Sequence, residues 1–208
     1  MAFKRNGYGQ VEPNQLSAQK TGQIYASLPL DSAVKVLQNG EFMYYDYSTG
    51  KVTAEPGVEG QEPMLVFNEV KLYEPFWQTS YKDFAMIRVG DNYVTSRLAT
   101  AQYGDGAETT GVSTAHSDWQ AGYRMDGIAP RLFKTNVGDI YTTNMVEAGD
   151  SITYAVKDIL KLKKVTAADG TKTLVLSKDG DIDTIQFVVA KVYTMPDGQD
   201  GLKIQRIK

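Results

Sequence analysis

Short apolar blocks separated by turn dipeptides constrain the fold of this 208-residue chain more than any other feature. The blocks are rich in Val, Ile, Thr, Tyr and Phe, which favour β-strands. The Asn-Gly and Asp-Gly pairs between them readily adopt the positive φ angles of tight hairpin turns. The pattern therefore predicts an all-β fold of antiparallel strands, closed as a β-barrel or stacked as a sandwich. We expect strands at residues 33–37, 41–47, 64–73, 84–89, 132–135, 139–143, 151–156, 159–165, 173–177, 185–194 and 202–207, with turn pairs that begin at Asn39, Asp169, Asp179 and Asp197.

Two stretches depart from the strand pattern. Residues 1–21 are polar and locally basic, and they show neither helical periodicity nor strict alternation. We therefore expect an extended N-terminal arm of coil that becomes ordered on a partner. The alternative is a terminal tail that lies along its own domain. Residues 76–130 form a long excursion, in which residues 100–122 are small, polar and rich in glycine, and such a loop is a candidate for a subunit contact. The remaining chain predicts a β-rich core at residues 22–208.

A weak internal repeat divides this core. The heptapeptide FNEVKLY aligns with the later FVVAKVY, and GEFMYY aligns with GDSITY. Strand and turn propensities alone can also produce such a match. The alignment is compatible with one domain or with two related β halves, at about residues 22–75 and 131–208.

Composition excludes several classes of protein. The absence of cysteine excludes disulfides, thiolate metal sites and a cysteine nucleophile. A net charge of −3 and a pI near 5.3 give no reason to expect direct nucleic-acid binding. No apolar run is long enough for a secretory signal or a membrane span. We therefore expect no membrane partner and synthesis in a cytoplasm.

Motifs that carry chemistry are weak in this sequence. One histidine and no cysteine leave nucleophilic triads and His-rich metal sites without support. Asp179, Asp181 and Asp183 alternate as in a calcium loop, but Thr184 and Ala190 stand where that loop needs Gly and Glu. The acids therefore favour a solvated turn. No pair of carboxylates is singled out for glycosidase chemistry, so we expect no catalytic residue, metal or cofactor.

Four segments of the chain resemble small virion structural proteins of tailed bacteriophages, which accompany the major capsid protein. These segments are MAFKRNGYGQVEPNQLSAQKTGQIYASLP, LQNGEFMYYDYSTGKV, MLVFNEVKLYE and RLFKTNVGDIYTTN. The resemblance implies a capsid decoration or cement protein, located in the virion, with a β-barrel or β-tulip-like fold. It also implies an extended arm that reaches across neighbouring capsid subunits.

Five residues of the arm are the expected contacts with such a partner. Phe3, Tyr8 and Leu16 supply apolar anchors, and burial of such anchors must offset the loss of backbone freedom when an arm becomes ordered. Lys4 and Arg5 supply charge that can pair with acidic groups. The expected partners are the major capsid protein and further copies of this chain.

Two other functions fit the same sequence features. A head–tail connector or tail-tube subunit would also be rich in β-strands, but it would form a closed ring. A carbohydrate-active β-sandwich enzyme or binding module could use Trp77 or Trp119 to stack on sugars. The predicted absence of catalytic residues favours a structural protein over the enzyme.

Overall fold

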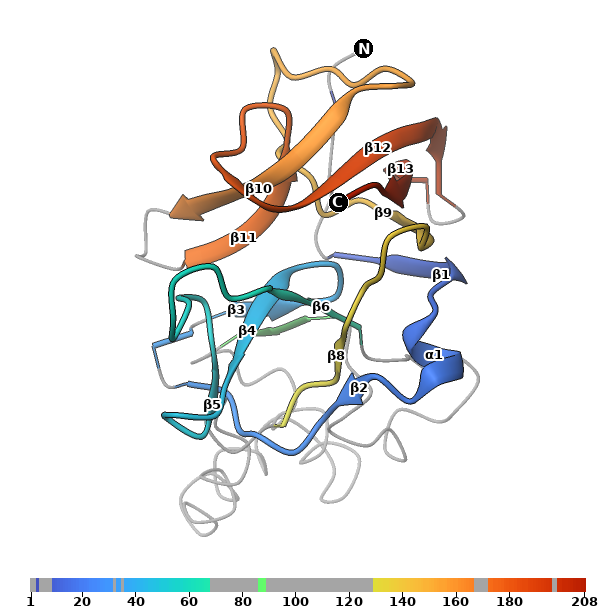
Figure 1. Ribbon diagram of the computed structural model, residues 1–208. Coiled ribbons are helices and arrows are strands. Elements are labelled where there is room, and N and C mark those ends of the chain that lie inside the picture. The colour runs from blue at the N-terminus through green and yellow to red at the C-terminus, as the bar shows by residue number, and fades with distance from the viewer. Residues whose placement is uncertain are drawn as a thin grey trace, which may run out of the picture.

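The computed structural model describes Phe3 and residues 9–31, 33–34, 36–67, 86–88, 129–166, 172–195 and 198–208 (Figure 1). Their regular structure is almost entirely β-strand, with one helix of a single turn. In chain order the elements are β1 (Val11–Gln15), α1 (Ala18–Thr21), β2 (Ile24–Tyr25), β3 (Val36–Gln38), β4 (Phe42–Asp46), β5 (Lys51–Thr53), β6 (Met64–Val66), β7 (Met86–Arg88), β8 (Leu132–Phe133), β9 (Ile140–Thr143), β10 (Ile159–Thr166), β11 (Lys172–Ser177), β12 (Ile182–Thr194) and β13 (Asp200–Arg206).

The strands confirm the expected all-β, antiparallel fold. Eleven of them form one sheet in the order β1-β9-β13-β12-β10-β11-β4-β6-β8-β2, with β5 attached to β4, and every strand pair in it is antiparallel. β3 and β7 pair separately. Because β4 pairs with β11, strands from residues 22–75 and from 131–208 belong to the same sheet.

The long sheet curls into a barrel-like shape, and its two edge strands are neighbours in sequence. β1 ends one edge and β2 ends the other, and only residues 16–23, which include α1, join them. Figure 1 shows α1 at the side of the molecule, between β1 above and β2 below. The N-terminal part of the chain therefore bridges the gap between the sheet edges.

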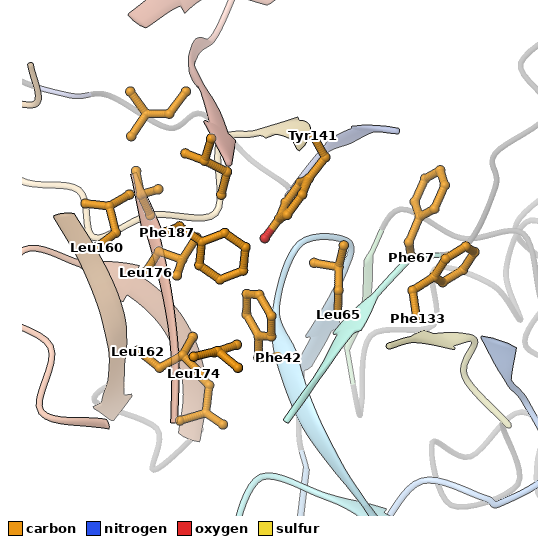
Figure 2. Close-up of a cluster of buried hydrophobic side chains, with 14 of the residues drawn as sticks. Phe42, Leu65, Phe67, Phe133, Tyr141, Leu160, Leu162, Leu174, Leu176 and Phe187 are labelled. Atoms are coloured by element: carbon orange, nitrogen blue, oxygen red, sulfur yellow. The ribbon is translucent and has the colours of Figure 1, made fainter. Parts of the chain in front are cut away.

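The main core lies inside the curl. Phe42, Tyr141 and Phe187 are fully buried there, with ring centroids 5.8 Å apart for Phe42 and Phe187 and 5.7 Å apart for Tyr141 and Phe187. Figure 2 shows these rings converging beside Leu65, with Leu162 on the opposite flank. Aromatic contacts of this kind contribute beyond the burial of their area.

β4 is buried on both faces, which explains its unbroken apolar run. Phe42 and Tyr44 face the main core, whereas Met43 and Tyr45 face a second core on the other side of the strand. The second core also contains Leu30, Val34, Leu37, Val52, Ala54, Val66 and Leu132. A strand covered on both sides needs apolar residues at every position, because alternation matters only when one face meets water.

Several strand and turn predictions are wrong. Residues 151–156 form no strand, and their match to the strand residues of GEFMYY is therefore not structural. The pairs at Asn39 and Asp179 do not join hairpins, because β3 and β4 pair with other strands and so do β11 and β12. The pairs at Asp169 and Asp197 lie between strands that do form hairpins, β10–β11 and β12–β13.

The prediction that residues 1–21 are coil is also wrong for part of this segment. Residues 11–15 form β1, which pairs with β9, and residues 18–21 form α1. VEPNQ carries little strand propensity, so tertiary pairing overrides local preference here. In the expected excursion of residues 76–130, only β7 and residues 129–130 lie within the described parts. Among all described residues, no helix has the length and apolar character that a membrane crossing requires.

Candidate interaction surface

The structure assigns two of the five predicted contact residues to the chain's own core. Phe3 is 5% exposed and Leu16 is 2% exposed, and both belong to the main core. In this conformation neither side chain has surface left for a partner. Lys4, Arg5 and Tyr8 lie outside the described residues.

Contacts with the loop after β9 hold Phe3 in place. Its backbone N–H donates a hydrogen bond to the carbonyl of Ile152 at 2.9 Å. Its ring meets the ring of Tyr154 edge to face, with centroids 5.4 Å apart. Phe3 is therefore part of the fold and cannot serve as a free anchor without leaving this site.

Two of the exposed large apolar side chains, Tyr47 and Val58, lie at the end of the β4–β5 hairpin and in the loop beside it. Tyr47 is 74% exposed and Val58 is 67% exposed. Their segments touch, because a Cβ on Gly57 would lie 2.7 Å from the Cγ atom of Asp46. Residues 47–50 and 57–58 together form what we call the hairpin-tip surface.

The carboxylate of Asp46 fixes the turn that carries Tyr47. It accepts hydrogen bonds from the Ser48 N–H at 2.8 Å, the Ser48 hydroxyl at 2.7 Å and the Thr49 hydroxyl at 2.8 Å. These bonds, the one from the Ser48 hydroxyl first, lower the pKa of Asp46 below its ordinary value. Gly50 completes the turn with a φ of 67°, which glycine adopts without strain.

Gln61 ties the second loop of the surface to the hairpin. Its side-chain amide donates to the carbonyl of Tyr45 at 3.0 Å and accepts from the N–H of Gly57 at 2.8 Å. Val58 is thereby held next to the turn despite its exposure. The backbone near both exposed side chains, Tyr47 and Val58, is therefore fixed by hydrogen bonds.

Tyr47 packs against a row of tyrosine rings, formed by Tyr45 and Tyr25, which we call the ladder. The ring of Tyr45 meets that of Tyr47 at 75° with centroids 5.1 Å apart, and it meets that of Tyr25 at 56° with centroids 5.3 Å apart. The hydroxyls of Tyr45 and Ser27 share a hydrogen bond. Since Tyr45 is only 3% exposed, the ladder anchors the exposed ring of Tyr47 in the second core.

A cavity of about 390 Å³ borders the same loop. Its charged lining residues are Glu55, Glu59, Lys164 and Asp181. Glu55 pairs with Lys164 and, at 3.2 Å, with Lys172, and these lysines lower its pKa. Since the three carboxylates outnumber the two lysines by one, this flank of the hairpin-tip surface carries a small net negative charge.

The sequence pattern does not predict this surface. Tyr47 ends the expected strand of residues 41–47, and Val58 has no expected role. The signal was present in Asp46-Tyr47-Ser48-Thr49-Gly50, in which an acid precedes two hydroxyl residues and a glycine, a composition typical of a capped turn. The contact between Asp46 and Gly57 depends on the fold and has no signature in the sequence.

No cluster of His, Asp or Glu side chains in the described parts of the chain could hold a metal ion. Comparisons with protein-family models, curated proteins and solved structures found no match to this chain.

Proposed function

We propose that the chain is a structural protein of a tailed-bacteriophage virion, which binds the assembled capsid and stabilises it as a decoration or cement protein. The phage assignment rests on the sequence resemblance described above. The observation that supports a binding role is the hairpin-tip surface, where Tyr47 and Val58 are exposed on a fixed backbone. Exposed apolar groups on a rigid support are typical of protein contacts.

Because the turn at residues 47–50 is rigid, a contact there loses little conformational freedom on binding. A binding surface loses free energy when loops and side chains must become ordered on association. Asp46 and Gln61 have already ordered the two loops that carry Tyr47 and Val58. Burial of the two side chains would contribute about 1.5–3 kcal/mol each at most, so a single contact of this size is modest.

A repeated target lets modest contacts act together. Many copies bound around the symmetry axes of a shell hold adjacent capsid subunits at once, and the effective concentration of each further contact is high. Such a protein stabilises a lattice without tight binding to any isolated subunit. The acidic flank with Glu59 and Asp181 favours a capsid surface that presents basic groups beside an apolar one.

Co-sedimentation tests this proposal. The full-length protein is mixed with assembled capsids that lack it and, separately, with unassembled capsid subunits. We expect saturable binding to assembled capsids and weak binding to free subunits, because only the shell offers repeated contacts. The full-length chain is needed because Phe3, Leu16 and Ala18 belong to the main core, so removal of residues 1–21 would disturb the fold itself.

The other outcomes discriminate between the alternatives. A closed ring formed by the purified protein, without binding to capsids, would favour a connector or tail-tube subunit. Absence of both binding and ring formation by folded protein would overturn the structural role in the capsid.

A further inference from the structure

The N-terminal segment is docked at an edge of the sheet. We define this docked segment as Phe3 and residues 9–18. Its strand β1 pairs with β9 alone and lies at the end of the strand order. Because β1 has one neighbour in the sheet, it can leave without separating any two other strands.

Groups from distant parts of the chain receive the docked segment. The N–H of Gln10 donates to the side chain of Asn144 at 2.6 Å, and the N–H of Ser17 donates to Asp139 at 3.1 Å. The hydroxyl of Thr142 donates to the side chain of Asn14 at 2.8 Å. These receptor groups lie more than 120 residues from the segment in sequence, so an identical receptor exists on every copy of the protein.

A short exposed joint follows the docked segment. Ala18 is fully buried, whereas Gln19, Lys20, Thr21 and Gly22 are all exposed. The joint is the single turn of α1, with no side-chain hydrogen bond at its N-cap and Gly22 at a φ of 69°. A helix of four residues has little stability of its own, so this joint can extend at small cost.

We propose that the docked segment is exchanged between copies of the protein. In the exchanged form the joint is extended, and β1 of one copy pairs with β9 of another. Phe3 and Leu16 then insert into the neighbour's core. Every docking contact is retained, and only the hydrogen bonds of the joint are lost, such as those from the N–H groups of Lys20 and Thr21 to the carbonyl of Ser17. Exchange therefore depends on local protein concentration, whether or not the partner is a capsid.

Engineered cysteines distinguish exchange from docking within one chain. The chain has no cysteine of its own. Exposed Gln15 on β1 lies opposite Ile140 on β9, and directly paired residues of antiparallel strands have a Cα separation that a disulfide can span. Protein with Gln15→Cys is mixed with protein with Ile140→Cys, concentrated and oxidised, and then analysed on a denaturing gel without reductant.

We expect a covalent heterodimer whose share rises with total protein concentration. A mixture of Gln15→Cys with Thr53→Cys is the control, because Thr53 pairs with Tyr44 on a different part of the sheet. The doubly substituted chain, Gln15→Cys with Ile140→Cys, shows that this pair is able to form a disulfide. If the double variant closes within the monomer and the mixture gives no more heterodimer than the control at any concentration, exchange is overturned.

A substitution in the joint gives a second test. A valine at position 22 would be strained at a φ of 69° but relaxed in an extended joint, and no atom lies within 4 Å of its Cβ to clash. We expect Gly22→Val to raise the dimerisation constant by at least roughly tenfold. Gly60→Val is the matched control, since Gly60 has a φ of 76° and equally open surroundings. An equal response of the two variants would contradict exchange through this joint.

Discussion

The hydroxyl of Tyr193 donates a hydrogen bond to the carboxylate of Glu12, which joins strand β12 to the edge strand β1 across 181 residues of sequence. Burial, followed by this hydrogen bond, raises the pKa of Tyr193 to about 12. The last long hairpin of the chain thus clamps its first strand.

This clamp predicts a dependence of stability on alkaline pH. A tyrosine whose pKa is higher in the folded state stabilises the fold while it is protonated. The contribution of Tyr193 is complete below about pH 10 and is lost as the pH rises through about 12. Tyr193→Phe should lower the unfolding free energy by about 1 kcal/mol at pH 8 and should lose less stability than the wild type between pH 9 and 11. Denaturant unfolding at pH 8, 9 and 11 measures the unfolding free energy of both proteins. An equal decline of this free energy in the two proteins between pH 9 and 11 would refute the prediction.

Removal of the buried hydroxyl of Tyr141 should stabilise the fold, whereas removal of the Tyr193 hydroxyl should destabilise it. The Tyr141 hydroxyl has no hydrogen-bond partner among the described residues, and burial raises its pKa well above the ordinary value. Because an unpaired buried hydroxyl destabilises a fold, Tyr141→Phe should raise the unfolding free energy by about 1 kcal/mol while it keeps the ring contact with Phe187. Thermal unfolding of the two proteins compares them, and a loss of stability would mean that the hydroxyl is paired.

Glu147 predicts a loss of stability in acid. Its carboxylate accepts from Lys163 at 2.6 Å and from the hydroxyl of Ser177, and these bonds lower its pKa below 4.5. The stabilisation is complete above about pH 4.5 and is lost as the pH falls through the lower pKa of the folded state. Glu147→Gln should therefore be less stable at pH 7, by about 1 kcal/mol. The difference should narrow in urea unfolding below pH 4, and a constant difference would contradict this account.

Leu16 tests whether the N-terminal segment is part of the fold. Since the side chain is 2% exposed, Leu16→Ala should lower the unfolding free energy of the purified protein by about 2–4 kcal/mol. Gln19→Ala, at an exposed position three residues later, should change it by less than about 0.5 kcal/mol. Equal stabilities of the two variants would instead support the free N-terminal arm that the sequence alone suggested.

The β-rich class was predictable because strand propensity and hairpin signals agree over the hairpins β10–β11 and β12–β13. The apolar run of β4 also identified a strand. Its two buried faces could not be predicted, because they depend on which segments cover Met43 and Tyr45. β1 was missed for the opposite reason, since VEPNQ has no alternation and is held by β9 and by side chains such as Thr142.

The candidate surface was less predictable than the fold. Phe3 and Leu16 were correctly recognised as the apolar groups of a polar segment, but apolar character does not reveal whether a side chain meets its own core or a partner. For Tyr47 the error is the opposite one, because its position in an aromatic block suggested burial although the side chain is exposed. Long-range contacts such as that of Gly57 with Asp46 decide these outcomes.

The most direct test of the account is the affinity of hairpin-tip variants for assembled capsids. The double variant Tyr47→Ser with Val58→Ser removes both exposed apolar groups, and Val137→Ser removes a side chain of similar exposure, 69%, outside the surface. All three proteins are first shown to be folded by denaturant unfolding. We predict at least roughly tenfold weaker capsid binding for the double variant and wild-type binding for Val137→Ser. Wild-type affinity of the folded double variant would contradict the assignment of the capsid contact to this surface.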